Sequence, residues 1–160
     1  MHTVNKHNIY CTIYYRHRLF FIFRILRYTY GVEVSPPFDP KVHDVAKRSK
    51  DGKRCLNVFK AFMERGQPLK KGSQLTITYH TTSANQRAIL LKIYATDQDI
   101  KYTTDAGCRF VGTMEMKLAT PRKELQDLEV TYAFGDTEIR VVGRELQTNH
   151  VCETVMTMNA

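Results

Sequence analysis

Hydrophobic and polar residues alternate through the stretch LEVTYAFGDTEIRVVGRE, residues 128–145. Apolar residues occupy alternate positions on both sides of the pair Gly135-Asp136. Successive side chains of an extended strand point to opposite faces, so this alternation predicts two strands, each with one buried face. Glycine tolerates the positive φ of tight hairpin turns, and we expect Gly135 to supply it. The stretch therefore predicts a β-hairpin.

Several other stretches are short, apolar and strand-like. They are separated by turn-forming or polar segments, such as SANQ at 83–86 and the loop 97–107. The predicted strands cover residues 31–34, 55–63, 73–82, 87–96, 108–118 and 150–158, in addition to the two strands of the hairpin. Short strands at this spacing, without helical periodicity, are typical of an antiparallel all-β sandwich or barrel. We expect about eight strands in all.

Residues 1–24 match neither the strand pattern nor a helical face. The run FFIFR at 20–24 would be encoded by pyrimidine-rich codons ending in AG if Arg24 uses an AGR codon, and the end of an intron looks like this. We therefore expect a leader unrelated to the rest of the chain, either disordered or the product of a mispredicted start, and a domain at 25–160. A genuine amphipathic leader is the alternative. The apolar patch of the leader is too short for a membrane span, so no membrane is expected.

Positive charge is concentrated in the first half of the chain. The net charge is +8; residues 1–72 contain 15 Lys and Arg against 5 Asp and Glu, whereas residues 73–160 contain 9 against 11. Much of the excess lies in a long loop predicted at 35–54, which begins with the helix-hostile sequence SPPFDP. Its basic part, 41–54, is interpreted either as a solvated loop, the commoner case, or as a clamp for nucleic acid.

The strands disfavour nucleic acid as the partner. Stacking on bases needs exposed aromatic side chains beside basic ones. Tyr79, Tyr94 and Phe110 occupy strand positions that are expected to be packed. The half of the chain that contains most strands is also slightly acidic.

Motifs for catalysis are missing from the sequence. Neither GxGxxG nor GxxxxGK[ST] occurs, which excludes nucleotide binding by those loops. The four cysteines are far apart in sequence, and no histidine stands at a metal-ligand spacing from another ligand. We expect no catalytic residue, no metal and no cofactor in this chain, and reduced thiols in a cytoplasmic protein.

The strand predicted at 87–96 is more apolar than one buried face requires. Ile89 and Leu91 share one face, and Leu90 lies on the other. Two interpretations are open: all three residues are core, which the pattern alone favours, or one pair lines an apolar groove. Sheet edges and grooves can hold an extended peptide through main-chain hydrogen bonds and side-chain pockets.

The order of these segments resembles the β-sandwich peptide-binding domain of the 70-kDa heat-shock chaperones, over about residues 25–160. The opening strand YGVEV is followed by a basic approach, ERGQPLKKG, to a Thr-rich strand and an Asn-Gln turn. A strand ending in Tyr and an acidic loop follows, and a Pro-Arg connection leads into EVTYAF. RYTYGV, the long loop before DGKRCLNVF, and FGDTEI look like the divergent branch of heat shock 70 kDa proteins 12A and 12B.

The resemblance implies a fold of two stacked four-stranded sheets, with a cleft that encloses one extended, Leu-rich segment of an unfolded polypeptide. The cleft positions that it implies are Val32, Thr82, Ile89 and Leu91, so it favours the groove interpretation. The family hydrolyses ATP, which implies a fragment of a longer ATP-binding protein, without the ATPase domain and the helical lid. An ATPase domain is then a further expected partner.

One departure from the family pattern lies beside the implied cleft. The family follows its opening strand with a short Gly-rich loop that arches over the peptide, whereas this chain has SPPFDPKVHDVAKRSKDGKR. Two possibilities stay open: Phe38 takes the place of the arch, or the whole loop closes the cleft.

Overall fold

The computed structural model describes residues 10–13 and 21–158 of the chain. Strands and one short 3-10 helix, η1 (Val45–Lys47), make up its regular structure. The strands are β1 (Tyr10–Ile13), β2 (Phe21–Ile25), β3 (Thr29–Val34), β4 (Val58–Met63), β5 (Pro68–Lys70), β6 (Gln74–His80), β7 (Ala88–Thr96), β8 (Arg109–Lys117), β9 (Asp127–Phe134), β10 (Glu138–Glu145) and β11 (Val151–Thr157).

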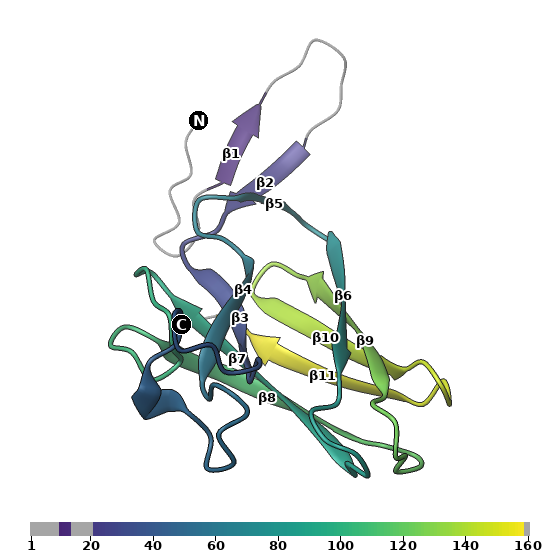
Figure 1. Ribbon diagram of the computed structural model, residues 1–160. Coiled ribbons are helices and arrows are strands. Elements are labelled where there is room, and N and C mark those ends of the chain that lie inside the picture. Colours follow the sequence, from purple (N-terminus) through teal and green to yellow (C-terminus); the bar gives the residue numbers. More distant parts are fainter. Residues whose placement is uncertain (1–9, 14–20, 159–160) are drawn as a thin grey trace.

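Two four-stranded antiparallel sheets form a β-sandwich (Figure 1). Their strand orders are β11-β10-β9-β6 and β4-β3-β7-β8. This confirms the predicted all-β, two-sheet fold, and these strands are the ones that the alternation predicts. Among the described residues there is no helix long and apolar enough to cross a membrane.

A third sheet was not predicted. It has the order β1-β2-β5 and lies at one end of the sandwich, where β1 and β2 extend away from the two larger sheets (Figure 1). Parts of the predicted leader therefore form strands, while residues 1–9 and 14–20 lie outside the described residues. The boundary predicted between residues 24 and 25 stays a prediction.

The core fills the space between the two larger sheets, as period-two alternation requires. Along β9 every second residue is buried, and β10 pairs with it so that Ile139 stands opposite Phe134. The predicted hairpin is confirmed, but its turn is not as expected. Positive φ occurs at four other glycines and not at Gly135, whose N–H instead donates to the Glu138 carbonyl at 2.9 Å. This bond closes the turn around Asp136 and Thr137 without a left-handed glycine.

Gly31 in the opening strand has a packing role. A Cβ built at this position would lie 2.6 Å from the Phe59 ring and 2.7 Å from the Lys60 carbonyl oxygen. Atoms cannot approach this closely, so only glycine allows β4 to pack with the Phe59 ring against β3.

Candidate functional site

The four predicted site residues divide into three buried apolar residues and one exposed threonine. Val32, Ile89 and Leu91 are 0%, 9% and 4% exposed and belong to the core cluster between the sheets. Thr82 lies in the turn after β6 and is exposed. The core interpretation thus accounts for the burial of the three apolar side chains. Their role in binding stays a prediction.

The strand β7 has an open edge beside these residues. On one side it pairs with β8 from Ala88 to Ala95. On the other side, β3 pairs only with Ile93–Thr96. Within the described part of the chain, no strand pairs with Ala88–Lys92 on that side. Unpaired strand edges present main-chain donors and acceptors to any extended segment that can reach them.

The Asn-Gln turn shapes the entrance to this edge. Asn85 adopts a positive φ of 55°, a conformation that asparagine tolerates better than most residues. The Gln86 side chain accepts from the Thr82 N–H at 3.0 Å and donates to the Ala88 carbonyl at 2.7 Å. One side chain therefore ties the end of β6 to the start of β7, which keeps Thr82 near the open edge.

The long loop begins and ends in a short paired segment, its stalk, in which residues 36–37 lie against residues 54–55. Residues 37 and 54 form an antiparallel bridge, and the Cys55 N–H donates to the Pro36 carbonyl at 2.9 Å. From this stalk the Arg54 guanidinium donates to two carbonyls, that of Ser35 at 2.8 Å and that of Thr82 at 2.9 Å. Sequence reasoning did not single out Arg54, whose only signal was its place in a basic segment.

Phe38 does not make this contact. Its ring lies 5.9 Å from the His43 ring and 5.0 Å from the Arg48 guanidinium carbon, so it packs inside the loop. The far part of the loop is anchored elsewhere, because the Asp44 N–H donates to the Tyr102 hydroxyl at 2.8 Å. The loop reaches Thr82 through Arg54, and closure of the cleft by the loop stays a prediction.

Several cations of the basic segment have intramolecular partners. Lys47 donates to the Thr104 hydroxyl, and Arg48 donates to the Gly52 carbonyl at 2.9 Å besides its contact with Phe38. These groups help to fold the loop. Among the strand aromatics, the prediction of burial is wrong for Phe110, which is 60% exposed because it lies on the outer face at the bulge opposite β7.

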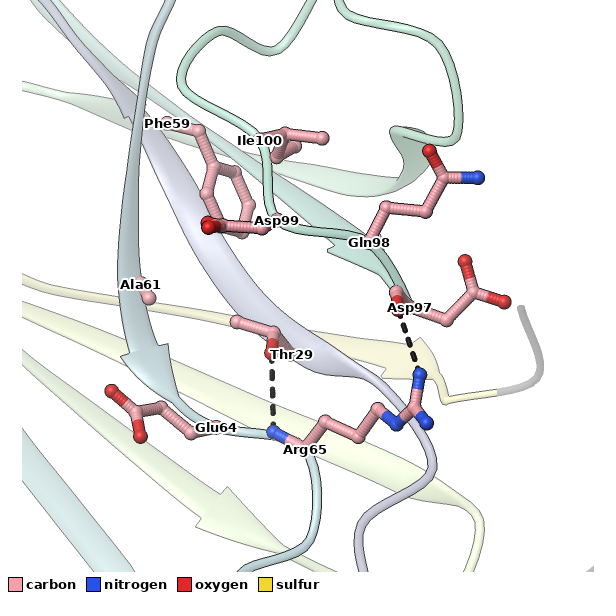
Figure 2. Close-up of a pocket in the computed structure, with 9 residues that line it drawn as sticks. All are labelled: Thr29, Phe59, Ala61, Glu64, Arg65, Asp97, Gln98, Asp99 and Ile100. Atoms are coloured by element: carbon pink, nitrogen blue, oxygen red, sulfur yellow. Dashed lines mark hydrogen bonds between the residues drawn. The ribbon is translucent and has the colours of Figure 1, made fainter.

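A polar hollow of about 410 Å³ lies beside β3 and β4, next to the segment that follows β7 (Figure 2). Arg65 crosses it. Its main-chain N–H donates to the Thr29 hydroxyl at 3.1 Å, and its guanidinium donates to the Asp97 carbonyl at 2.8 Å. The residues around it are Thr29, Phe59, Ala61, Glu64, Arg65, Asp97, Gln98, Asp99 and Ile100, which include none of the predicted site residues. No cluster that could hold a metal occurs among the described residues.

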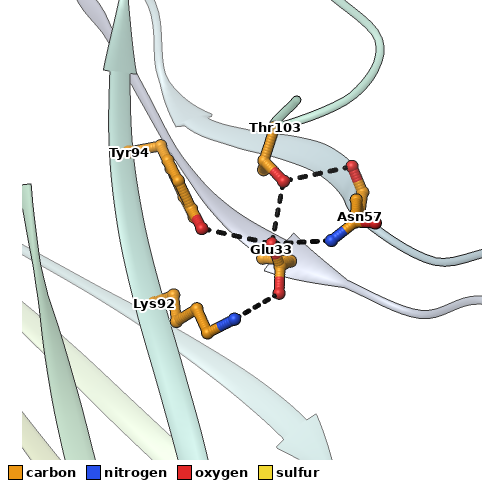
Figure 3. Close-up of polar contacts among 5 residues, drawn as sticks. All are labelled: Glu33, Asn57, Lys92, Tyr94 and Thr103. Carbon is orange, nitrogen blue, oxygen red and sulfur yellow. Dashed lines mark hydrogen bonds and ion pairs between the residues drawn. The ribbon is translucent and has the colours of Figure 1, made fainter. Parts of the chain in front are cut away.

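Glu33 sits at the centre of a polar network on the outer face of β3 (Figure 3). Its carboxylate accepts from Lys92 at 2.9 Å and from the Thr103 hydroxyl at 2.8 Å. Asn57 and the Tyr94 hydroxyl donate to it as well, each at 3.2 Å. The network joins β3 to β7 and to the loop 97–107, at the place where these two strands begin to diverge.

This network predicts a pH-dependent contribution to stability. Burial acts to raise the pKa of Glu33, but the bonds from Lys92, Thr103 and Asn57 outweigh it and hold the pKa below the ordinary 4.5. A lowered pKa stabilises the fold above the ordinary value, and this stability is lost as the pH falls through the lowered pKa. We expect the difference in unfolding free energy between wild type and Glu33→Gln to be constant at neutral pH and to shrink below pH 4.5. Urea unfolding of both proteins across this range measures it, and a constant difference would contradict the network.

Comparison with known proteins supports the resemblance in its general form. No protein-family model matches the chain. The chain is 30% identical over 135 residues to heat shock 70 kDa protein 12B of Homo sapiens, a match that covers 76% of this chain. It covers 19% of the relative, so the chain spans about a fifth of the length of the curated protein that it matches. The chain is thus similar in sequence to one part of a 70-kDa heat-shock protein.

Proposed function

We propose that this domain binds extended apolar peptide segments in the manner of a chaperone, at the open edge of β7. The observation that carries the proposal is the divergence of β3 from β7, which leaves Ala88–Lys92 without a strand partner on one side in the described residues. An extended peptide that lies along this edge adds main-chain hydrogen bonds without regard to its sequence. Sequence-independent capture of extended segments suits a chaperone.

The burial pattern of β7 sets the preference for apolar peptides. A strand added beside β7 points alternate side chains inward, next to Ile89 and Leu91, and outward, next to the exposed Leu90. Burying one leucine contributes about 1.5–3 kcal/mol, and each main-chain hydrogen bond contributes about 1 kcal/mol. After the cost of ordering the peptide, the affinity is about micromolar at its tightest.

The similarity to the relative supports a proposal about the wider role. Because the chain corresponds to about a fifth of heat shock 70 kDa protein 12B, we place it in the branch of the 12A and 12B proteins, as a peptide-binding part of a longer ATP-binding protein. Peptide release would then be coupled to an ATPase domain. Val32, Thr82, Ile89 and Leu91 are the residues that border the peptide.

Fluorescence anisotropy of the full chain with a labelled Leu-rich peptide tests the proposal. We expect saturable binding at micromolar concentrations that changes little with salt. The matched control is the same peptide with alternate backbone nitrogens methylated, which should bind at least about tenfold more weakly because the main-chain bonds are lost.

A labelled oligonucleotide provides the competing outcome. Oligonucleotide binding that weakens steeply as salt rises, without peptide binding, would move the function to the basic segment 41–54. Absence of peptide binding, or equal binding of the methylated peptide, would contradict strand addition at β7.

A further inference from the structure

We propose that Arg54 is a latch that closes the β7 edge over a bound peptide and must release for the peptide to enter or leave. This inference rests on the proposed function, because it concerns access to the same edge. It starts from the one guanidinium that donates to both the Ser35 and the Thr82 carbonyls.

The latch joins the two sheets at the mouth of the site. Ser35 directly follows β3, which belongs to the sheet β4-β3-β7-β8, whereas Thr82 lies just after β6, which belongs to the other sheet. The open edge of β7 starts at Ala88, which the Gln86 side chain links to Thr82. A peptide that approaches Ala88–Lys92 therefore meets the Arg54 bridge.

The loop is built so that this bridge can open without unfolding the loop. Its stalk is fixed by main-chain bonds, since the Phe38 N–H donates to the Lys53 carbonyl and the Cys55 N–H to the Pro36 carbonyl, both at 2.9 Å. Its far part is fixed by the bond from the Asp44 N–H to the Tyr102 hydroxyl. Rotation of the Arg54 side chain alone breaks the contact with Thr82 and leaves these anchors intact.

Arginine suits this role for a chemical reason. Its planar guanidinium carries donors that point in different directions, so one side chain satisfies two carbonyls at once. The contact with Thr82 is exposed, so water can replace it and the bridge can exchange readily. When it opens, the carbonyl of Thr82 becomes free to accept from a peptide N–H.

The test is the kinetics of peptide binding to the full chain, by stopped-flow anisotropy with the labelled Leu-rich peptide. For Arg54→Ala we expect association and dissociation both to become roughly tenfold faster, because a charge-assisted hydrogen bond no longer has to break. Arg54→Gln keeps one donor, so its rates should fall between those of wild type and Arg54→Ala. The matched control is Arg48→Ala, which removes an arginine of the same loop that contacts Phe38 and Gly52, and its rates should equal those of wild type.

The outcomes separate the latch from the site itself. Peptide binding by wild type and Arg54→Ala at equal rates would overturn the latch and leave the proposed function standing. Faster kinetics in Arg48→Ala as well would also overturn it, because general loosening of the loop would then explain the effect. Absence of binding by wild type would overturn the proposed function and the latch together. If Arg54→Ala fails to fold, the Arg54→Gln rates decide between these outcomes.

Discussion

Leu91→Asp is expected to unfold the domain. Leu91 is 4% exposed and packs in the core between the sheets. The substitution loses the burial of the leucine, about 1.5–3 kcal/mol, and places a carboxylate among the apolar side chains of the core cluster, which costs several kcal/mol more. Together these losses approach the whole stability of a typical domain, about 5–15 kcal/mol. Circular dichroism at increasing temperature should show a cooperative transition for wild type and none, or one far lower, for the variant.

Leu90→Asp is the matched control on the same strand. Leu90 is the next residue along β7 and is 58% exposed, so an aspartate there stays in water and should leave the melting temperature nearly unchanged. If Leu91→Asp instead melts like wild type and only loses peptide binding, Leu91 faces a solvent-accessible cleft and the core interpretation of this residue fails. The pair of variants therefore separates the two interpretations of this strand.

Glu145→Ala is expected to lower the free energy of unfolding by about 3 kcal/mol or more. Glu145 is 0% exposed at the end of β10, and its oxygens accept from Gln126 at 2.9 Å, from Thr148 at 2.5 Å and from the Ala119 N–H at 3.3 Å. Removing the carboxylate leaves these donors without an acceptor, and each buried unsatisfied donor costs about 1–3 kcal/mol. Urea unfolding measures the loss.

A half-buried glutamate on the neighbouring strand, more exposed than Glu145, serves as the control. Glu129 of β9 is bonded to Arg144 at 2.8 Å near the surface, and surface ion pairs contribute only about 0–1 kcal/mol. Glu129→Ala should therefore cost much less than Glu145→Ala, and Glu145→Gln, which keeps one acceptor oxygen, should lie between them. Equal losses for the two alanine variants would show that the Glu145 network is not the source of the stability.

The alternation of residues predicted which side chains enter the core. Tyr132 and Phe134 fall on the inward face by period two, and both are buried. The same period places Glu145 inside, because it continues the inward series after Val141 and Gly143. Its partners could not be predicted, since Gln126 and Ala119 reach it from a separate connection. Phe110 shows the opposite case, where a bulge between β7 and β8 moves an aromatic residue outward.

The sequence by itself determined the class of fold, the positions of the sandwich strands and the face that each one buries, because these depend on the local period of apolar residues. Only the tertiary structure decided where the pairing of β3 with β7 ends, and that Arg54 joins Ser35 after β3 to Thr82 after β6. Both depend on contacts between residues far apart in the chain: Arg54 meets a carbonyl 28 positions away, and Glu33 meets Lys92 across 59. Local patterns do not specify such distances, so the open edge of β7 and the contact of Arg54 with Thr82 emerge only when the sheets are assembled.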